Sequence, residues 1–149
     1  MEKQTKFTLT YKVKEILPLV KKTDKRILAK WAYDCVERVL SYFEKTSKDK
    51  RPRKALQTLK KWLKDGIFKM KDVRKASLDS HAAAREIKED TPAKSAARAA
   101  GQAIATTHVK THSVAAAQYA LQAIYRKTNS MKEVEKERQW QLQYLKKLI

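Results

Sequence analysis

The chain has 149 residues, of which 42% are hydrophobic and 34% charged, and its formal net charge is +19. This is the length of one domain, with enough apolar side chain to build a core, so a wholly disordered chain is excluded. Two glycines and three prolines are too few for the tight turns of a β-sandwich or barrel, and too few glycines for a P-loop or a dinucleotide-binding fingerprint. The composition therefore predicts an all-α fold.

The cellular compartment is predicted from the single cysteine and from the lack of a signal peptide or a long apolar run. Cys35 is the one cysteine, which excludes an internal disulfide and a thiolate zinc cluster; within an apolar helical pattern it is predicted to be a small buried residue. The first residues carry lysines and Glu2 where a signal peptide would be apolar, and no apolar run reaches about 18 residues. These observations predict a cytoplasmic protein that does not contact a membrane.

Residues 1–22 are predicted to form a short N-terminal arm, and residues 23–149 the all-α domain. Phe7, Leu9, Tyr11 and Val13 alternate with polar residues, a period of two that is typical of a strand, yet no second strand is available for pairing. We favour an extended arm lying on the domain over a strand that pairs with a partner chain. The second alternative leaves a homo-oligomer open.

The domain is predicted to be a bundle of about six helices, because apolar residues recur at spacings of three and four. Asp49 and Pro52 mark the start of the second helix and Gly66 its end, while Thr91 caps the fourth and Ser130 the sixth. Leu78 is counted among the apolar positions of the third. The predicted helices span residues 24–46, 49–66, 71–89, 92–108, 113–127 and 130–149.

The two halves of the chain differ in charge and side-chain size. The net charge is +14 in residues 1–75 and +5 in residues 76–149, and alanine accounts for 16 of the 48 residues from 76 to 123. Alanine favours helix and lets helix axes approach closely. We therefore expect one bundle with a bulky-core half and a small-residue half.

A lysine-rich surface is the strongest functional signal. Such a surface attracts polyanions, and both nucleic acid and an acidic protein fit it. Lysine outnumbers arginine, however, and the aromatic residues fall on core stripes instead of alternating with the basic residues, which disfavours nucleic acid. The residues predicted to bind a partner are Lys21, Lys22, Lys25, Arg51, Arg53, Lys60, Lys61 and Lys64.

The histidines and the carboxylates give little support for catalysis. His108 and His112 are four residues apart, a spacing used by metal ligands, but no glutamate follows the first histidine and no third ligand is evident. His81 and Arg85 form a second pair of the same spacing. Hydrogen bonding within the fold is the favoured interpretation for both pairs, so we predict no metal, no cofactor and no catalytic residues.

Several segments together resemble a bacterial family of immunity proteins from polymorphic toxin systems, the set with an all-α immunity domain. Each is a generic amphipathic helix alone, and their order carries the resemblance. The matching segments are LAKWAYDCVERVLSYFE (28–44), DKRPRKALQTLKKWLKDG (49–66), HAAAR (81–85), AARAAGQAIATTHVKTH (96–112) and ERQWQLQYL (137–145).

The resemblance implies a helical protein that binds and blocks a bacterial toxin by occlusion, without catalysis. Its pattern includes Arg51 and Arg53 and also nine residues that we interpret as structural, with Asp34 expected to pair with an arginine and His81 with a helix end. These nine are Trp31, Asp34, Pro52, His81, Arg85, Gly101, His108, His112 and Trp140.

The positive charge limits the class of toxin that we expect this protein to bind. Inhibitors of nucleases typically present acidic surfaces, and like charges oppose encounter, so a protein of net charge +19 is not expected to bind a basic nuclease. The leading hypothesis is an immunity protein that binds an acidic or acid-patched toxin. The alternative is a basic helical protein that binds nucleic acid.

Overall fold

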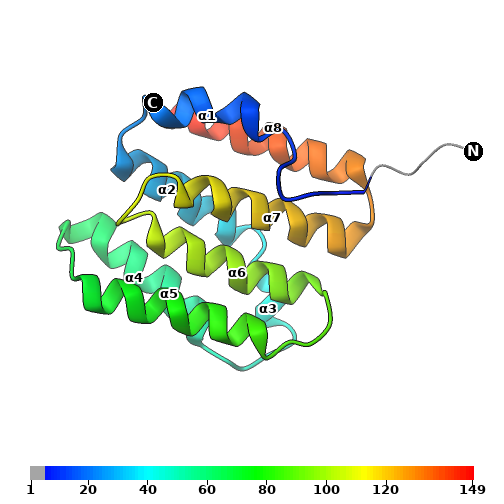
Figure 1. Ribbon diagram of the computed structural model, residues 1–149, viewed down its shortest axis with the longest axis horizontal. Coiled ribbons are helices and arrows are strands. Elements are labelled where there is room, and N and C mark those ends of the chain that lie inside the picture. Colours follow the sequence, from blue (N-terminus) through cyan, green and yellow to red (C-terminus); the bar gives the residue numbers. More distant parts are fainter. Residues whose placement is uncertain (1–5) are drawn as a thin grey trace, which may run out of the picture.

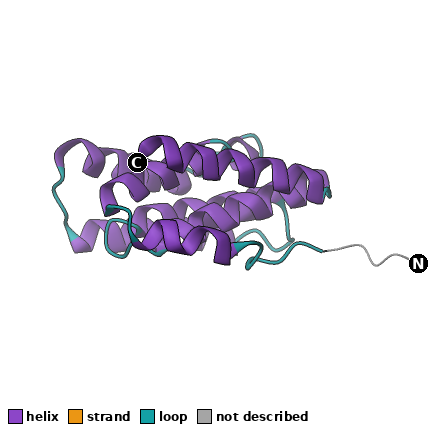
Figure 2. Cartoon of the chain, turned by 90° about the horizontal axis from the view of Figure 1, so that it is seen from above, coloured by secondary structure: helices purple, strands orange, loops and turns teal. Residues whose placement is uncertain are grey.

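Helices are the only regular secondary structure in residues 6–149, the part of the chain that the computed structural model describes. They run roughly along the long axis of the molecule in two perpendicular views (Figures 1 and 2). The prediction of an all-α bundle is confirmed, with eight helices in place of about six. The helices are α1 (Val13–Lys21), α2 (Lys25–Glu37), α3 (Ser41–Glu44), α4 (Arg51–Asp65), α5 (Met70–Arg85), α6 (Pro92–Ala105), α7 (His112–Thr128) and α8 (Met131–Leu148).

Three predicted helix ends are confirmed by their capping contacts, whereas α5 and α6 end at Arg85 and Ala105, before the predicted residues 89 and 108. The Thr91 side chain accepts a hydrogen bond from the amide of Lys94, and the Ser130 side chain accepts one from the amide of Glu133. Gly66 closes α4 with φ +69°, a left-handed conformation that glycine adopts without strain. Residues that cap backbone groups are local signals, which is why the sequence located these ends correctly.

The helix predicted over residues 24–46 is divided into α2 and α3. At the division the amide of Val39 bonds to the carbonyl of Val36, three residues back, so the helix tightens for about one turn. Val39 and Leu40 remain fully buried. The apolar periodicity therefore continues through the break, and no glycine or proline marks it.

The predicted arm is partly helical from residue 6 onward, which corrects the expectation of an extended segment; its residues 1–5 lie outside the described part of the chain. Residues 13–21 form α1, and its Ile16 and Val20 are buried, one helical turn apart. Residues 6–12, which we call the N-terminal strap, contain turns and no helix or strand. The alternation of apolar and polar residues that suggested an extended arm ends at Val13, where the helical spacing of buried residues in α1 begins.

The strap is held against α7 and α8 by buried polar groups. The side-chain amide of Gln118 donates to the carbonyls of Leu9 (2.8 Å) and Tyr11 (2.9 Å). Arg138, only 1% exposed, donates to the Tyr11 carbonyl (3.3 Å) and to the side chain of Gln141 (3.1 Å). No carboxylate within residues 6–149 forms an ion pair with this guanidinium.

The core consists of two clusters. The larger is rich in alanine and joins α5, α6 and α7 to bulkier side chains of α2, α3 and α4 such as Phe43 and Leu56. The smaller lies between α1, α2, α7 and α8 and is centred on the fully buried Trp31 and Cys35. The prediction that Cys35 is buried is confirmed, and burial raises the pKa of its thiol well above the ordinary value.

None of the helices within residues 6–149 combines the length and apolar character that a membrane span requires.

Candidate functional site

Six of the predicted partner-binding lysines lie at one end of the bundle. Lys21, Lys22 and Lys25 flank the connection between α1 and α2, while Lys60, Lys61 and Lys64 are on the last turns of α4. We call this region the basic end; in Figure 1 it is at the left, where the α1–α2, α4–α5 and α6–α7 connections gather. All six side chains are exposed except that of Lys25, which is half-buried.

Two polar contacts hold these connections together. A guanidinium nitrogen of Arg26 at the start of α2 donates to the carbonyl of Leu63 near the end of α4. The ammonium of Lys110, between α6 and α7, donates to the Lys21 carbonyl at 3.0 Å. Residues far apart in the sequence are thereby placed on one surface, which apolar periodicity could not reveal.

Arg51 and Arg53, the other two predicted partner-binding residues, lie at the opposite end of α4 and are engaged within the molecule. Arg53 binds Glu37 of α2 (2.8 Å) and Glu44 of α3 (2.7 Å). Its hydrogen bond to Glu44 lowers the pKa of that carboxyl below the ordinary value. The guanidinium thus joins three helices across the break between α2 and α3.

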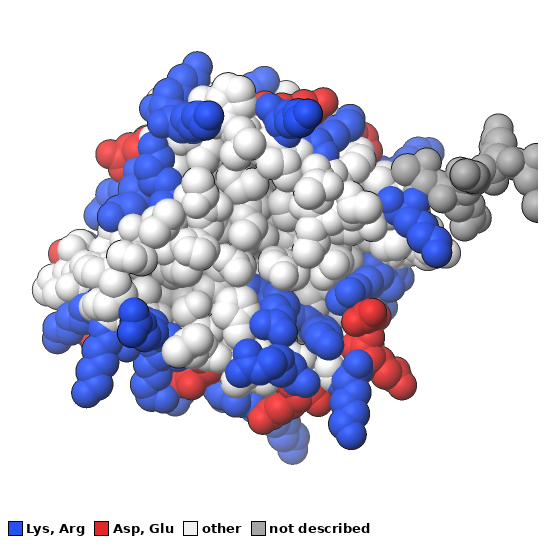
Figure 3. Space-filling model, in the orientation of Figure 1, with Lys and Arg blue, Asp and Glu red and all other residues white. Residues whose placement is uncertain are grey.

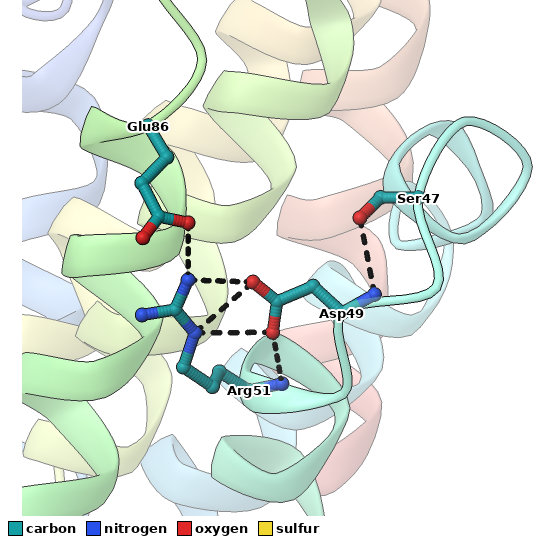
Figure 4. A network of polar contacts seen from close by, with 4 residues as sticks. All are labelled: Ser47, Asp49, Arg51 and Glu86. Carbon is teal, nitrogen blue, oxygen red and sulfur yellow. Dashed lines mark hydrogen bonds and ion pairs between the residues drawn. The ribbon is translucent and has the colours of Figure 1, made fainter.

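Arg51 belongs to a second network, shown in Figure 4. Its guanidinium pairs with Asp49 (2.6 Å) and with Glu86 at the end of α5. Asp49 also accepts a hydrogen bond from the Arg51 amide (3.0 Å), while the Ser47 hydroxyl accepts one from the Asp49 amide (3.1 Å). Asp49 thus binds the first amide of α4 as expected, but Lys50 occupies the cap position.

A cleft of about 670 Å³ opens beside this network. Its apolar lining comes from α3, the end of α5 and the start of α6, and includes Tyr42, Ile87 and Pro92. Charged groups of both signs surround it, among them Glu86 and Lys127. The cleft lies at the end of α5 opposite the basic end.

The structure brings His81 and Gly101 together, two of the residues expected to be structural. A Cβ added to Gly101 would lie 2.7 Å from Nε2 of His81, so the imidazole occupies the space that any other residue would fill. Arg98 lies 3.2 Å from Nδ1 of the ring. Because a guanidinium only donates, Nδ1 accepts and the proton of the neutral ring is on Nε2.

The environment of His81 favours this neutral form. Burial, followed by the charges of Arg98 and Arg85 and the proximity of His112, lowers the pKa of His81 to about 4. The expectation that His81 pairs with a helix end is wrong; its partner is a side chain on α6. Arg85 itself is exposed in the last turn of α5.

His108 and His112 have different partners despite their spacing. His108 stacks on Phe68 with ring centroids 6.1 Å apart, and Nδ1 of His112 is 2.7 Å from the side-chain oxygen of Gln102. Helix α7 begins at His112, so the two histidines are not on one continuous helix. Within residues 6–149, no three His, Cys, Asp or Glu side chains are grouped as a metal site would require.

Trp31, Asp34 and Trp140 lie in the seam between α2 and α8. The indole of the buried Trp31 donates to the Gln141 carbonyl at 2.8 Å. Asp34 accepts from Tyr144 and pairs with Lys30 (2.8 Å), not with an arginine as expected. Burial and this hydrogen bond raise the pKa of Tyr144 to about 12.

The exposed edge of the same seam carries an aromatic stack. Trp140 and Tyr144 have ring centroids 5.0 Å apart, and the Arg38 guanidinium lies 3.8 Å from the Trp140 ring. Arg38 also pairs with Glu137 at 2.7 Å. Pro52 is likewise placed structurally, because it is buried in the first turn of α4.

The basic end also exposes apolar side chains that the sequence did not reveal. Leu78 was predicted at an apolar position of its helix, yet it is 57% exposed because it lies about 140° around α5 from the buried Val73. Ile67, Phe68 and Met70, at the α4–α5 connection, are exposed as well. The sequence did contain one signal of this exposed group: the apolar residues Ile67 and Phe68 directly follow the helix-ending Gly66 in a lysine-rich segment.

Basic side chains are distributed around the molecule unevenly. On the face shown in Figure 3 the centre is largely uncharged, and Lys and Arg gather at its edges. The described side chains thus offer a basic surface with apolar residues in it, a cleft of mixed charge, and polar networks whose members bind one another. The first of these is suited to binding an acidic surface.

A family model described as "Imm-5 like putative immunity protein" matches residues 18–148. No curated protein and no solved structure matched the chain.

Proposed function

The chain belongs to the Imm-5 like family of putative immunity proteins, and from that premise we propose that it binds a cognate bacterial toxin and neutralises it by occlusion. The observation that carries the proposal is the family match over residues 18–148. The structure is compatible with a binding role, because exposed lysines of α1, α4 and the α1–α2 connection lie at one end of the bundle. Neutralisation by this route requires no catalytic group, and we propose that this chain has none.

We further propose that the toxin presents an acidic surface to this protein. The net charge of +19 accelerates encounter with an acidic partner and slows encounter with a basic one. The lysines of the basic end are available for such contacts, whereas Arg51 and Arg53 already have carboxylate partners. We therefore assign partner contact to Lys21, Lys22, Lys25, Lys60, Lys61 and Lys64.

Co-expression tests the proposal. Cells that produce the toxin domain encoded beside the gene for this chain should survive when the full chain is co-expressed, and should die when an unrelated helical protein of similar charge replaces it. In a purified assay, inhibition should reach completion near one equivalent of this protein. The toxin recovered under denaturing conditions should have its original mass. Absence of rescue would contradict the proposed function, and a mass change would contradict occlusion.

Nucleic-acid binding is the second candidate, supported by the excess of 35 basic over 16 acidic side chains. It predicts retardation of a DNA duplex at about 50 mM salt that falls steeply as the salt concentration rises, because each neutralised phosphate releases counterions. Retardation with that salt dependence, together with absence of rescue from the toxin, would favour this candidate over the first.

A further inference from the structure

Exposed apolar side chains are concentrated around the start of α5. Seven large apolar residues are exposed among those that the structure describes, and five of them lie in this region. Single exposed apolar residues are ordinary, but a group of this kind marks a surface that binds something. We call this group the apolar patch; its members are Ile67, Phe68, Met70, Leu78 and Val109.

Two observations place members of the apolar patch beside one another or beside the α6–α7 connection. Met70 and Leu78 line one shallow hollow, together with the side chains of Lys71, Arg74 and Lys75. Phe68 extends the patch towards the α6–α7 connection, where its ring stacks on that of His108, the residue before Val109. The patch therefore runs along two turns of α5 and across to a second connection of the basic end.

Basic residues surround the apolar patch. Three acidic residues, Asp65, Asp72 and Asp79, lie among five basic ones, and Asp79 pairs with Lys75 at 2.7 Å. The rim therefore has a net positive charge, and no element of residues 6–149 covers its apolar centre. The exposed basic residues of this rim are Lys64, Lys69, Lys71, Arg74 and Lys75.

We propose that the apolar patch and its basic rim are the docking site for an acidic protein, namely a toxin surface with apolar side chains at its centre and aspartate or glutamate around them. This inference rests on the proposed function and adds the centre and chemistry of contact: of the six lysines assigned above, Lys64 belongs to the rim and Lys61 lines the hollow beside Ile67. An apolar centre with a charged rim is the usual arrangement of protein interfaces. Burying residues such as Leu78 supplies affinity, and the rim selects the sign of the partner.

The same surface fits other polyanions less well. Nucleic acid would leave Ile67 and Leu78 without apolar partners, and Phe68, the aromatic residue of the patch, is already stacked on His108. An anionic membrane would press its headgroups against the exposed Asp72, which lines a hollow beside Ile67. A protein surface can place a lysine or an amide opposite such a carboxylate.

Affinity measurements on exposed variants test this assignment. The full chain is titrated with the toxin domain encoded beside its gene, and Ile67→Asp and Leu78→Asp are compared with Leu9→Asp. Leu9 is exposed on the strap, away from the basic end, and its substitution changes the net charge equally. We expect the first two variants to weaken binding about tenfold or more, the range of central interface residues, and Leu9→Asp to stay within about twofold, as for a residue outside the interface.

Two charge-reversal variants distinguish a specific effect of the rim from the effect of net charge. Arg74→Glu reverses a charge in the rim, and Lys132→Glu reverses an exposed charge at the start of α8, on the other side of the molecule. Arg74→Glu should slow association with the toxin far more than Lys132→Glu does. Urea unfolding of each variant checks that its fold is retained.

The outcomes distinguish this proposal from the proposed function. If the wild type binds the toxin and the patch variants bind equally well, the docking site is wrong and the proposed function stands. If the wild type neither binds nor protects against the toxin, both proposals fail. A third outcome is that Leu78→Asp leaves toxin binding unchanged but abolishes binding to phosphatidylserine vesicles or to a DNA duplex. That result would assign the patch to a membrane or to nucleic acid, respectively. Loss of a dimer in Leu78→Asp by sedimentation, with toxin binding unchanged, would assign it to a second copy.

Discussion

The imidazole of His81 lies directly over Gly101, so that α5 and α6 meet where one residue has a ring and the other has no side chain. Ser77 and Ser80 strengthen the same seam, because their hydroxyls donate to the carbonyls of Gly101 (2.9 Å) and Ala97 (2.8 Å). The close approach depends on the small residues of α6. Gly101 is therefore required by packing and not by backbone conformation.

Gly101→Ala should destabilise the protein. Alanine in a helix interior is favoured over glycine by about 1 kcal/mol, but a Cβ 2.7 Å from the His81 ring forces overpacking that costs about 1–3 kcal/mol. We expect a net loss of about 1 kcal/mol in the free energy of unfolding, measured in urea. In a His81→Ala background the same substitution should stabilise, and a Gly101→Ala protein at least as stable as the wild type would refute the packing argument.

The stability of the protein should decrease on mild acidification because of His81. Its pKa is about 4 in the folded state, below its ordinary value of 6.5, so the unfolded state binds the proton first as the pH falls. The contribution is complete above about pH 6.5 and is lost as the pH falls towards 4. Unfolding free energies between pH 7.5 and 4.5 should decline less for His81→Gln than for the wild type, and parallel curves would contradict this assignment.

Glu135 should contribute to stability at a lower pH. Burial alone would raise its pKa, but hydrogen bonds from Lys12, Tyr11 and Gln139 lower it to about 2. A carboxyl with a lowered pKa stabilises the fold above its ordinary pKa of 4.5 and ceases to do so as the pH falls through the folded value. Acid unfolding followed by circular dichroism should show that Glu135→Gln is less stable than the wild type at pH 6 and that the two converge near pH 2. A constant difference across this range would be inconsistent with this role.

Arg53 should matter for the fold and not for the partner. Arg53→Ala removes ion pairs to Glu37 and Glu44, and we expect a loss of about 1 kcal/mol, the upper range for a partly exposed network. Toxin affinity should remain within about twofold of the wild type, as for a residue outside the interface. Lys64→Ala provides the opposite comparison, with unchanged stability and weaker binding. A tenfold weaker Arg53→Ala complex would return this residue to the binding surface.

Sequence patterns predicted those features of the fold that depend on local chemistry. Thr91, Ser130 and Gly66 identified helix ends because each satisfies backbone groups within its own turn. The break after Glu37 and the helix at Val13 were missed, since neither carries a distinctive residue.

The candidate site was harder to predict for a different reason. The lysines of the basic end were identified from charge, but their proximity depends on tertiary contacts such as that between Arg26 and Leu63. Leu78 was assigned to an apolar position because of its residue type, although its angular position on α5 makes it exposed. Arg51 and Arg53 were grouped with the lysines by charge alone, and only the tertiary structure shows their carboxylate partners.

The buried Arg138 contacts a residue that lies outside the range matched by the family model. One guanidinium nitrogen donates to the carbonyl of Tyr11, which precedes the matched residues 18–148, while Nε has no hydrogen-bond partner within residues 6–149. A chain reduced to the matched residues would retain α2 to α8 but leave a buried cation without that acceptor, and Gln118 without either of its own. Burial of an unsatisfied charge is strongly unfavourable. The stable folding unit is therefore expected to extend upstream of the matched residues, to include Leu9 and Tyr11.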